Sequence, residues 1–221
     1  MKILLTETEV RCLGALIEKS ITTPDYYPMT LNALTNACNQ KSNRDPVVHY
    51  TEETVARTLD SLWNKKLVTH VSEAGSRVRK YGHDFTDVFE LDPAAVAVAC
   101  TLMLRGPQTF GEIKGRCARM HEFATLKDVA QTLESLANHN EGALVLKLER
   151  QAGRKESRYA HLLAGTPEFP ESEFEIPAEP ATLAVLEEND RITKLENETA
   201  GLRRELEALR DRLNAFVRQF E

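Results

Sequence analysis

The chain contains 221 residues with a formal net charge of −6, and 42% of its residues are hydrophobic while 28% are charged. This composition is typical of a soluble globular protein, and the length corresponds to one large domain or two small ones. No apolar run approaches the roughly 20 residues that a membrane-spanning helix requires, and the N-terminus lacks the apolar stretch of a signal peptide. We therefore expect a cytoplasmic protein without a membrane segment.

The cysteine spacing excludes the common cysteine frameworks. Cys12, Cys38, Cys100 and Cys117 are separated by 26, 62 and 17 residues. This pattern matches neither a CxxC zinc or redox motif nor a dense disulfide framework. We expect four buried thiols.

The acidic charge is concentrated at the C-terminal end. Residues 1–90 carry a net charge of −1, residues 91–165 carry +2 and residues 166–221 carry −7. The first 165 residues therefore remain compatible with nucleic-acid binding, although they lack a strongly basic footprint. Residues 164–182 contain four prolines and five glutamates but no Lys or Arg, which predicts an extended linker over residues 166–182.

An internal repeat organises the first 165 residues. The segment Val55–Leu62 recurs as Val129–Leu136, with six of eight positions identical. Each of these segments ends a longer copy of the repeat that contains two further helical patterns upstream. A threonine or aspartate precedes each of these patterns and is a predicted N-cap: Thr6 and Thr30 in the first copy, Asp92 and Thr109 in the second. Each copy therefore contains three predicted helices.

A hairpin pattern follows each third helix. Residues 67–71 and 77–81 are rich in β-forming residues and flank a glycine turn, and residues 143–148 and 157–159 repeat this arrangement. Three helices followed by a hairpin is the order of a winged helix, a variant of the helix-turn-helix. The predicted fold class is mainly α with small β-hairpins, as two tandem winged-helix domains over residues 1–90 and 91–165.

The C-terminal residues 183–221 carry a heptad pattern. The apolar seam comprises Ile192, Leu195, Leu202, Leu206, Leu209, Leu213 and Phe216. One polar residue, Thr199, interrupts it, and Glu198 and Glu205 occupy positions that would face Arg203 and Arg210 of a parallel partner. We expect a homodimeric coiled coil, because packing of this helix on its own chain would explain the seam but not the charge match.

Several sequence blocks resemble the YceH-like family of bacterial proteins. They are Leu16–Lys19 with Thr22–Pro24, the block that runs from Tyr27–Pro28 to Asn39–Val47, then Leu104–Thr109, and Arg119–Phe123 with Lys155–Tyr159. The resemblance covers essentially the whole chain. It implies a pair of winged-helix domains and supplies no catalytic residues.

No constellation of residues indicates catalysis. The sequence lacks GxSxG, P-loop, GxGxxG and HExxH motifs, and its six histidines do not show metal-ligand spacing. His83 and Asp84 are neighbours, but adjacent side chains in an extended segment point apart. We therefore expect a protein that is not an enzyme and has no cofactor or metal.

The two third helices differ in their predicted outward faces. The first presents Glu53, Arg57, Asp60 and Asn64, and its two acidic side chains would repel phosphates. The second presents Lys127, Gln131 and Asn138 beside Glu134, and a glutamine can contact an adenine edge. A solvated helix face is the alternative interpretation in both copies.

Basic residues on the hairpins and on the second helix of copy two could contact phosphates, although exposed hairpins also carry such residues for solubility. The polar stretch Asn39–Pro46 could form a phosphate-contacting loop, or Asn39, Asn43 and Asp45 could simply shape a turn. The candidate nucleic-acid-binding residues are Lys41, Asn43, Arg44, Arg57, Arg77, Arg79, Lys80, Lys114, Arg116, Arg119, Lys127, Gln131, Arg154, Lys155 and Arg158.

Two functional hypotheses follow. The first is a homodimeric regulator that binds double-stranded DNA through its winged helices, with avidity compensating for weak individual modules. The second is a scaffold that binds protein partners through the winged helices and the coiled coil, without DNA. The fold alone does not choose between them.

Overall fold

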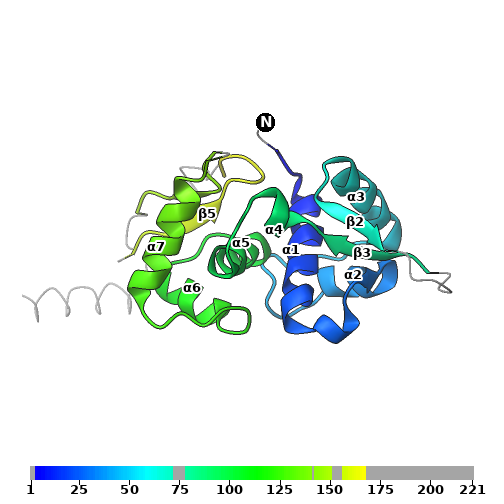
Figure 1. Ribbon diagram of the computed structural model, residues 1–221, viewed down its shortest axis with the longest axis horizontal. Helices are drawn as coiled ribbons and strands as arrows, with labels where there is room; N and C mark the ends of the chain where they lie inside the picture. Colours follow the sequence, from blue (N-terminus) through cyan, green and yellow to red (C-terminus); the bar gives the residue numbers. More distant parts are fainter. Residues whose placement is uncertain (1–2, 72–77, 141, 151–155, 168–221) are drawn as a thin grey trace, which may run out of the picture. The chain divides into compact units, whose positions relative to one another are not determined.

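The computed structural model describes residues 3–71, 78–140, 142–150 and 156–167 (Figure 1). The chain divides into two compact units, Met1–Glu168 and Phe169–Glu221. The second unit lies outside the described residues, and so do the predicted coiled coil and all but the first two residues of the predicted linker.

The described fold is mainly helical with two small antiparallel sheets. The first half contains α1 (Glu7–Thr22), a 3₁₀ turn η1 (Pro24–Tyr26), β1 (Met29–Thr30), α2 (Leu31–Cys38), α3 (Glu52–Asn64), β2 (Val68–Val71) and β3 (Lys80–His83). The second half contains α4 (Phe85–Val88), α5 (Pro93–Arg105), α6 (Phe110–Cys117), α7 (Leu126–Ala137), β4 (Val145–Lys147) and β5 (Tyr159–His161). Helix α4 joins the two halves along the chain.

The two sheets repeat one pairing pattern. In the first sheet the strand order is β1-β3-β2, with Met29 opposite Tyr81. In the second sheet β4 pairs with β5, and an isolated bridge joins Gln108 to Tyr159. Gln108 precedes α6 as Met29 and Thr30 precede α2, so the bridge occupies the place of β1.

The predicted helix starts are confirmed. Side chains of Thr6, Thr30, Asp92 and Thr109 each accept a hydrogen bond from a backbone N–H one turn into their helix. Such caps satisfy donors that the first helical turn leaves without partners. The second strand of each hairpin begins two or three residues later than predicted, at Lys80 and at Tyr159.

The repeated third helices bury matching faces. In α3 the side chains of Val55, Leu59 and Leu62 are buried, and the equivalent positions of α7 are Val129, Leu133 and Leu136. All four cysteines are buried thiols, as expected. None of the helices among the described residues combines the length and apolar character that crossing a membrane requires.

Helices α1 and α5 hold the two halves together (Figure 1). Every residue of α5 from Ala95 to Leu104 is buried. Gly14 of α1 lies so close to α5 that a Cβ added there would stand 3.0 Å from Leu104 Cδ2. The thiol of Cys100 donates to the Gly14 carbonyl over 3.3 Å. A side chain at Gly14 would therefore require the side chains of Leu104 and Met103 to shift, since a packed interior has little spare volume.

Candidate functional site

The exposed face of α3 is acidic, as predicted. Glu53, Arg57, Asp60 and Asn64 are all exposed. The Arg57 guanidinium donates to the Glu53 carboxylate over 2.5 Å, one turn away. The only cation on this face therefore already has a carboxylate partner, and the face attracts phosphates weakly.

The exposed face of α7 is less acidic than that of α3, because it carries one lysine and one glutamate beside two amide side chains. Lys127, Gln131, Glu134 and Asn138 are exposed there. The structure gives the side chains of Lys127 and Gln131 no hydrogen-bond partner among the described residues. These two groups can therefore bind an external ligand without breaking an internal contact.

The basic residues of α6 do not form one outward patch. The Lys114 ammonium donates to the Ala124 carbonyl over 2.8 Å and so closes the α6–α7 loop. The Arg116 guanidinium donates to the Gln108 side chain and lies 3.3 Å from the Glu112 carboxylate. Arg119 is exposed, and no other described residue hydrogen-bonds to its side chain.

The hairpin candidates are described only in part. Arg79 is exposed, whereas Lys80 and Arg158 are half-buried. The Nε atom of Arg158 is buried and has no hydrogen-bond partner in the part of the chain that the structure describes. Arg77, Arg154 and Lys155 lie outside the described residues.

The polar loop after α2 has mainly a structural role. The Asn39 side chain both donates to the Tyr50 carbonyl, over 2.8 Å, and accepts from the Tyr50 N–H, over 2.7 Å. Lys41 is exposed, and Asn43 has a positive φ of 60°. The Asp45 N–H donates to the Leu104 carbonyl at the end of α5 over 2.9 Å. The loop thus connects the first copy of the repeat, residues 1–90, to the second, residues 91–165.

Arg44 lies inside the protein and not on its surface. Its guanidinium forms a 2.7 Å ion pair with Glu18, and its side chain is completely buried. The same guanidinium donates to the carbonyls of Ala37, over 2.9 and 3.2 Å, and of Asn43, over 2.9 Å. Because its donors are used internally, Arg44 cannot contact a nucleic acid, and the interface proposed below does not include it.

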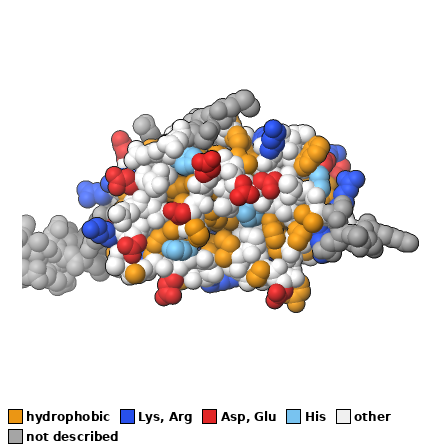
Figure 2. Space-filling model, in the orientation of Figure 1, with side chains coloured by type: hydrophobic (Ala, Val, Ile, Leu, Met, Phe, Trp, Pro, Cys, Tyr) orange, Lys and Arg blue, Asp and Glu red, His pale blue; other side chains and the backbone are white. Residues whose placement is uncertain are grey.

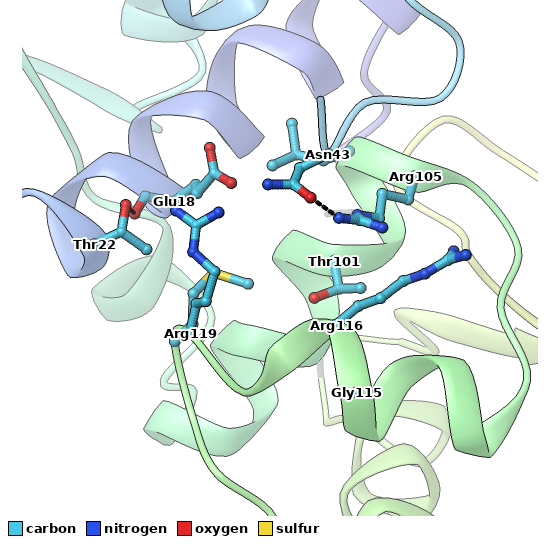
Figure 3. A pocket seen from close by; sticks show the side chains of 10 residues that line it. Glu18, Thr22, Asn43, Thr101, Arg105, Gly115, Arg116 and Arg119 are labelled. Atoms are coloured by element: carbon cyan, nitrogen blue, oxygen red, sulfur yellow. Dashed lines mark hydrogen bonds between the residues drawn. The ribbon is translucent and has the colours of Figure 1, made fainter. Parts of the chain in front are cut away.

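A cavity of about 160 Å³ lies where α1, α5 and α6 meet. It is lined by Glu18, Thr22, Asn43, Thr101, Leu104, Arg105, Gly115, Arg116, Arg119 and Met120. Arg105 donates to the Asn43 side chain across the cavity rim (Figure 3). Burial, followed by repulsion from Arg116, lowers the pKa of Arg105, and Arg44 and Arg119 add to that repulsion. The charged residues that line the cavity are thus three arginines and one glutamate.

The sequence did not indicate this cavity. Arg105 lies in the block Leu104–Thr109 that carries the family resemblance, but nothing in that block points to a partner 62 residues away in sequence. Asn43, Arg116 and Arg119 are among the candidate nucleic-acid-binding residues, and all three line the cavity.

A serine and a histidine lie close together elsewhere in the first half. Ser20 Oγ and His83 Nε2 are 3.0 Å apart, and Ser20 also donates to the Ile17 carbonyl over 2.9 Å. Burial lowers the pKa of His83 to about 4. Its Nδ1 atom is buried without a hydrogen-bond partner in the described ranges. The Ser20–His83 pair joins α1 to β3. Among the described residues, no three His, Cys, Asp or Glu side chains are grouped so that they could hold a metal ion.

Comparison with known proteins identifies relatives over the full length of the chain. The family described as "Protein of unknown function, DUF480" matches residues 5–154. A UPF0502 protein of Geotalea uraniireducens is 52% identical, and one of Geobacter sulfurreducens is 50% identical, each over 100% of both chains. A UPF0502 protein of Opitutus terrae is 51% identical over 90% of this chain and 83% of its own.

The burial of Arg44 generates a stability prediction. Replacing Arg44 by Met leaves the Glu18 carboxylate and the Ala37 carbonyl without their donor, so the free energy of unfolding should fall by about 3–5 kcal/mol. The matched control is Arg57→Met, which breaks an exposed pair and should cost about 0–1 kcal/mol. Urea unfolding of both variants measures the difference. Equal losses for the two variants would contradict a structural role for Arg44.

Proposed function

This chain belongs to the DUF480 family, and we propose that it binds double-stranded DNA as a homodimeric regulator with two winged-helix domains, residues 1–90 and 91–165. The supporting observation is the repeated order of three helices and a hairpin, in which each third helix buries one face and exposes the other. In a winged helix this exposed face enters the major groove.

Helix α7 is the better groove-binding helix of the two. Its exposed Lys127 and Gln131 have no internal partners among the described residues, and they offer a phosphate contact and a base-edge contact. Helix α3 exposes Glu52, Glu53 and Asp60, which repel a duplex. The second half of the repeat therefore makes most of the proposed contacts.

The hairpins would contact the flanking phosphates. Arg79 is exposed beside β3, and Arg158 lies next to β5. The sequence adds Arg77, Arg154 and Lys155, and Lys41 on the polar loop remains available. The proposed interface consists of Lys41, Arg77, Arg79, Lys80, Lys114, Lys127, Gln131, Arg154, Lys155 and Arg158. Phosphate contacts of this kind position a protein without carrying sequence information.

Dimerisation would strengthen the binding of such modules. The heptad seam from Ile192 to Phe216 is the proposed dimer contact. Two linked copies bind a duplex with a higher effective concentration than one copy does. A dimer would thus compensate for the small number of basic contacts on each domain.

A protein-binding scaffold is the second candidate. The acidic exposed face of α3 favours it, and Figure 2 shows acidic side chains spread across the visible face of the molecule, with basic ones mainly near its edges. A face of this charge suits a basic protein partner better than a nucleic acid. The C-terminal heptads would then dock a partner protein.

Fluorescence anisotropy against a random-sequence duplex at two salt concentrations tests DNA binding. We expect binding that weakens steeply with salt, and Lys127→Gln should reduce the slope of log K against log salt by about 0.9, the value for one lost phosphate contact. Arg57→Gln is the matched control and should leave affinity and slope unchanged. No binding at low salt would contradict the proposal and favour the scaffold.

Light scattering of the full-length protein tests the dimer. The double variant Leu202→Lys and Leu209→Lys places charges in the apolar seam, so it should be monomeric, because buried unpaired charges are costly. Ala208→Lys, outside the seam, should remain dimeric. A wild-type monomer would exclude the homodimer, and a dimeric double variant would move the dimer contact away from the seam.

A further inference from the structure

The cavity between α1, α5 and α6 has an unusual charge balance for an internal surface. Glu18 lines it but is paired with the buried Arg44, and Arg116 lines it but is paired with Glu112. Neither Arg105 nor Arg119 has a carboxylate within ion-pair distance among the described residues. Two positive charges at the cavity are therefore not balanced by the protein residues around them.

The unbalanced groups lie on opposite sides of the cavity (Figure 3). Arg105 and Asn43 form one side, Arg119 extends along the other, and Thr101 lies between them. The Arg116 guanidinium points away from this space, toward Gln108. Arg105 uses one amino group on the Asn43 oxygen, which leaves further guanidinium N–H groups available. Figure 3 shows the Arg105 guanidinium directed at Asn43 and the Arg119 guanidinium extending toward Glu18 and Thr22, so the two cations line opposite sides of one cavity.

The cavity is accessible and small. Gly115 and Arg119 are exposed, so the cavity opens to solvent. Its volume of about 160 Å³ is below the roughly 300 Å³ of the smallest sites for drug-sized ligands. It can hold a small molecule or the anionic end of a larger one.

The charge selects the class of ligand. Two guanidinium groups without a carboxylate partner favour a ligand of about two negative charges, and a phosphate monoester carries roughly −1.5 to −2 at pH 7 with three acceptor oxygens. A carboxylate supplies only one charge. Arginine is also the side chain that best matches phosphate oxygens, because its planar fork donates two parallel hydrogen bonds.

We infer that this cavity is a binding site for a small phosphate monoester, held between Arg105 and Arg119. Asn43 orients Arg105, and the buried pair of Glu18 and Arg44 fixes the wall from which Asn43 projects. The site takes its walls from both halves of the repeat. The inference does not depend on DNA binding, since no group of α7 contributes to the cavity.

Calorimetric titration of the full-length protein with methyl phosphate tests the site. The control ligand is methyl sulfate, which has the same tetrahedral shape but one negative charge. At a pH of about 7.5, above the second pKa of a phosphate monoester near 6, we expect saturable binding of methyl phosphate and at least about tenfold weaker binding of methyl sulfate. Equal affinity for the two ligands, or no binding of methyl phosphate at millimolar concentration, would overturn the proposal.

Two variants test the placement of the ligand. Arg119→Gln removes one unbalanced charge from an exposed residue without an internal partner, and it should weaken methyl phosphate binding by about tenfold, the loss expected for one charge-assisted hydrogen bond. Gly115→Leu adds bulk at the cavity wall, where a Cβ would meet no heavy atom within 4 Å. It should abolish binding while raising the melting temperature, because leucine favours a helix more than glycine does.

A control variant separates this site from the proposed DNA interface. Lys127→Gln makes the same change of charge as Arg119→Gln but lies outside the cavity, so it should bind methyl phosphate like the wild type. Unchanged binding in Arg119→Gln and Gly115→Leu would overturn the assignment to this cavity. That result would not bear on the proposed DNA binding, because the anisotropy measurement of Lys127→Gln with duplex DNA tests that proposal separately.

Discussion

The contact between α1 and α5 is the constraint on which the rest of the described structure depends. Gly14 allows the two helix backbones to approach, because any side chain there would meet Leu104 and Met103. The Cys100 thiol then reaches the Gly14 carbonyl. The N-terminal segment adds a second connection, since the Leu5 N–H donates to the Leu163 carbonyl over 2.7 Å. Two copies of one repeat therefore share a continuous core.

This contact also creates the arginine-lined cavity. Glu18 follows Gly14 by about one turn of α1, and Arg105 ends α5, so the packing of these helices brings both residues to one cavity. The polar loop reinforces the junction through Arg44 on Glu18 and Asn43 on Arg105. Arg105 and Arg119 both belong to the second half, and Glu18, Thr22 and Asn43 of the first half line the same cavity.

Local features of the fold were predictable from the sequence, and long-range ones were not. The N-caps at Thr6 and Asp92 and the exposed faces of α3 and α7 follow from residue type and helical spacing, and the structure confirms them. The burial of Arg44 depends on Glu18, 26 residues away, and the cavity depends on the Asn43–Arg105 contact. No local pattern encodes such pairs, because each joins segments that lie far apart in the sequence. The heptad seam remains a sequence prediction.

Native-state hydrogen exchange tests most directly whether α1 and α5 join both halves into one cooperative unit. We predict that the slowest amides of α3, in the first half, and of α7, in the second half, exchange with the same free energy of opening and the same denaturant dependence. That result would mean that neither half opens without the other. Faster exchange of one complete half, with a smaller free energy and a smaller denaturant dependence while the other half stays protected, would contradict the account.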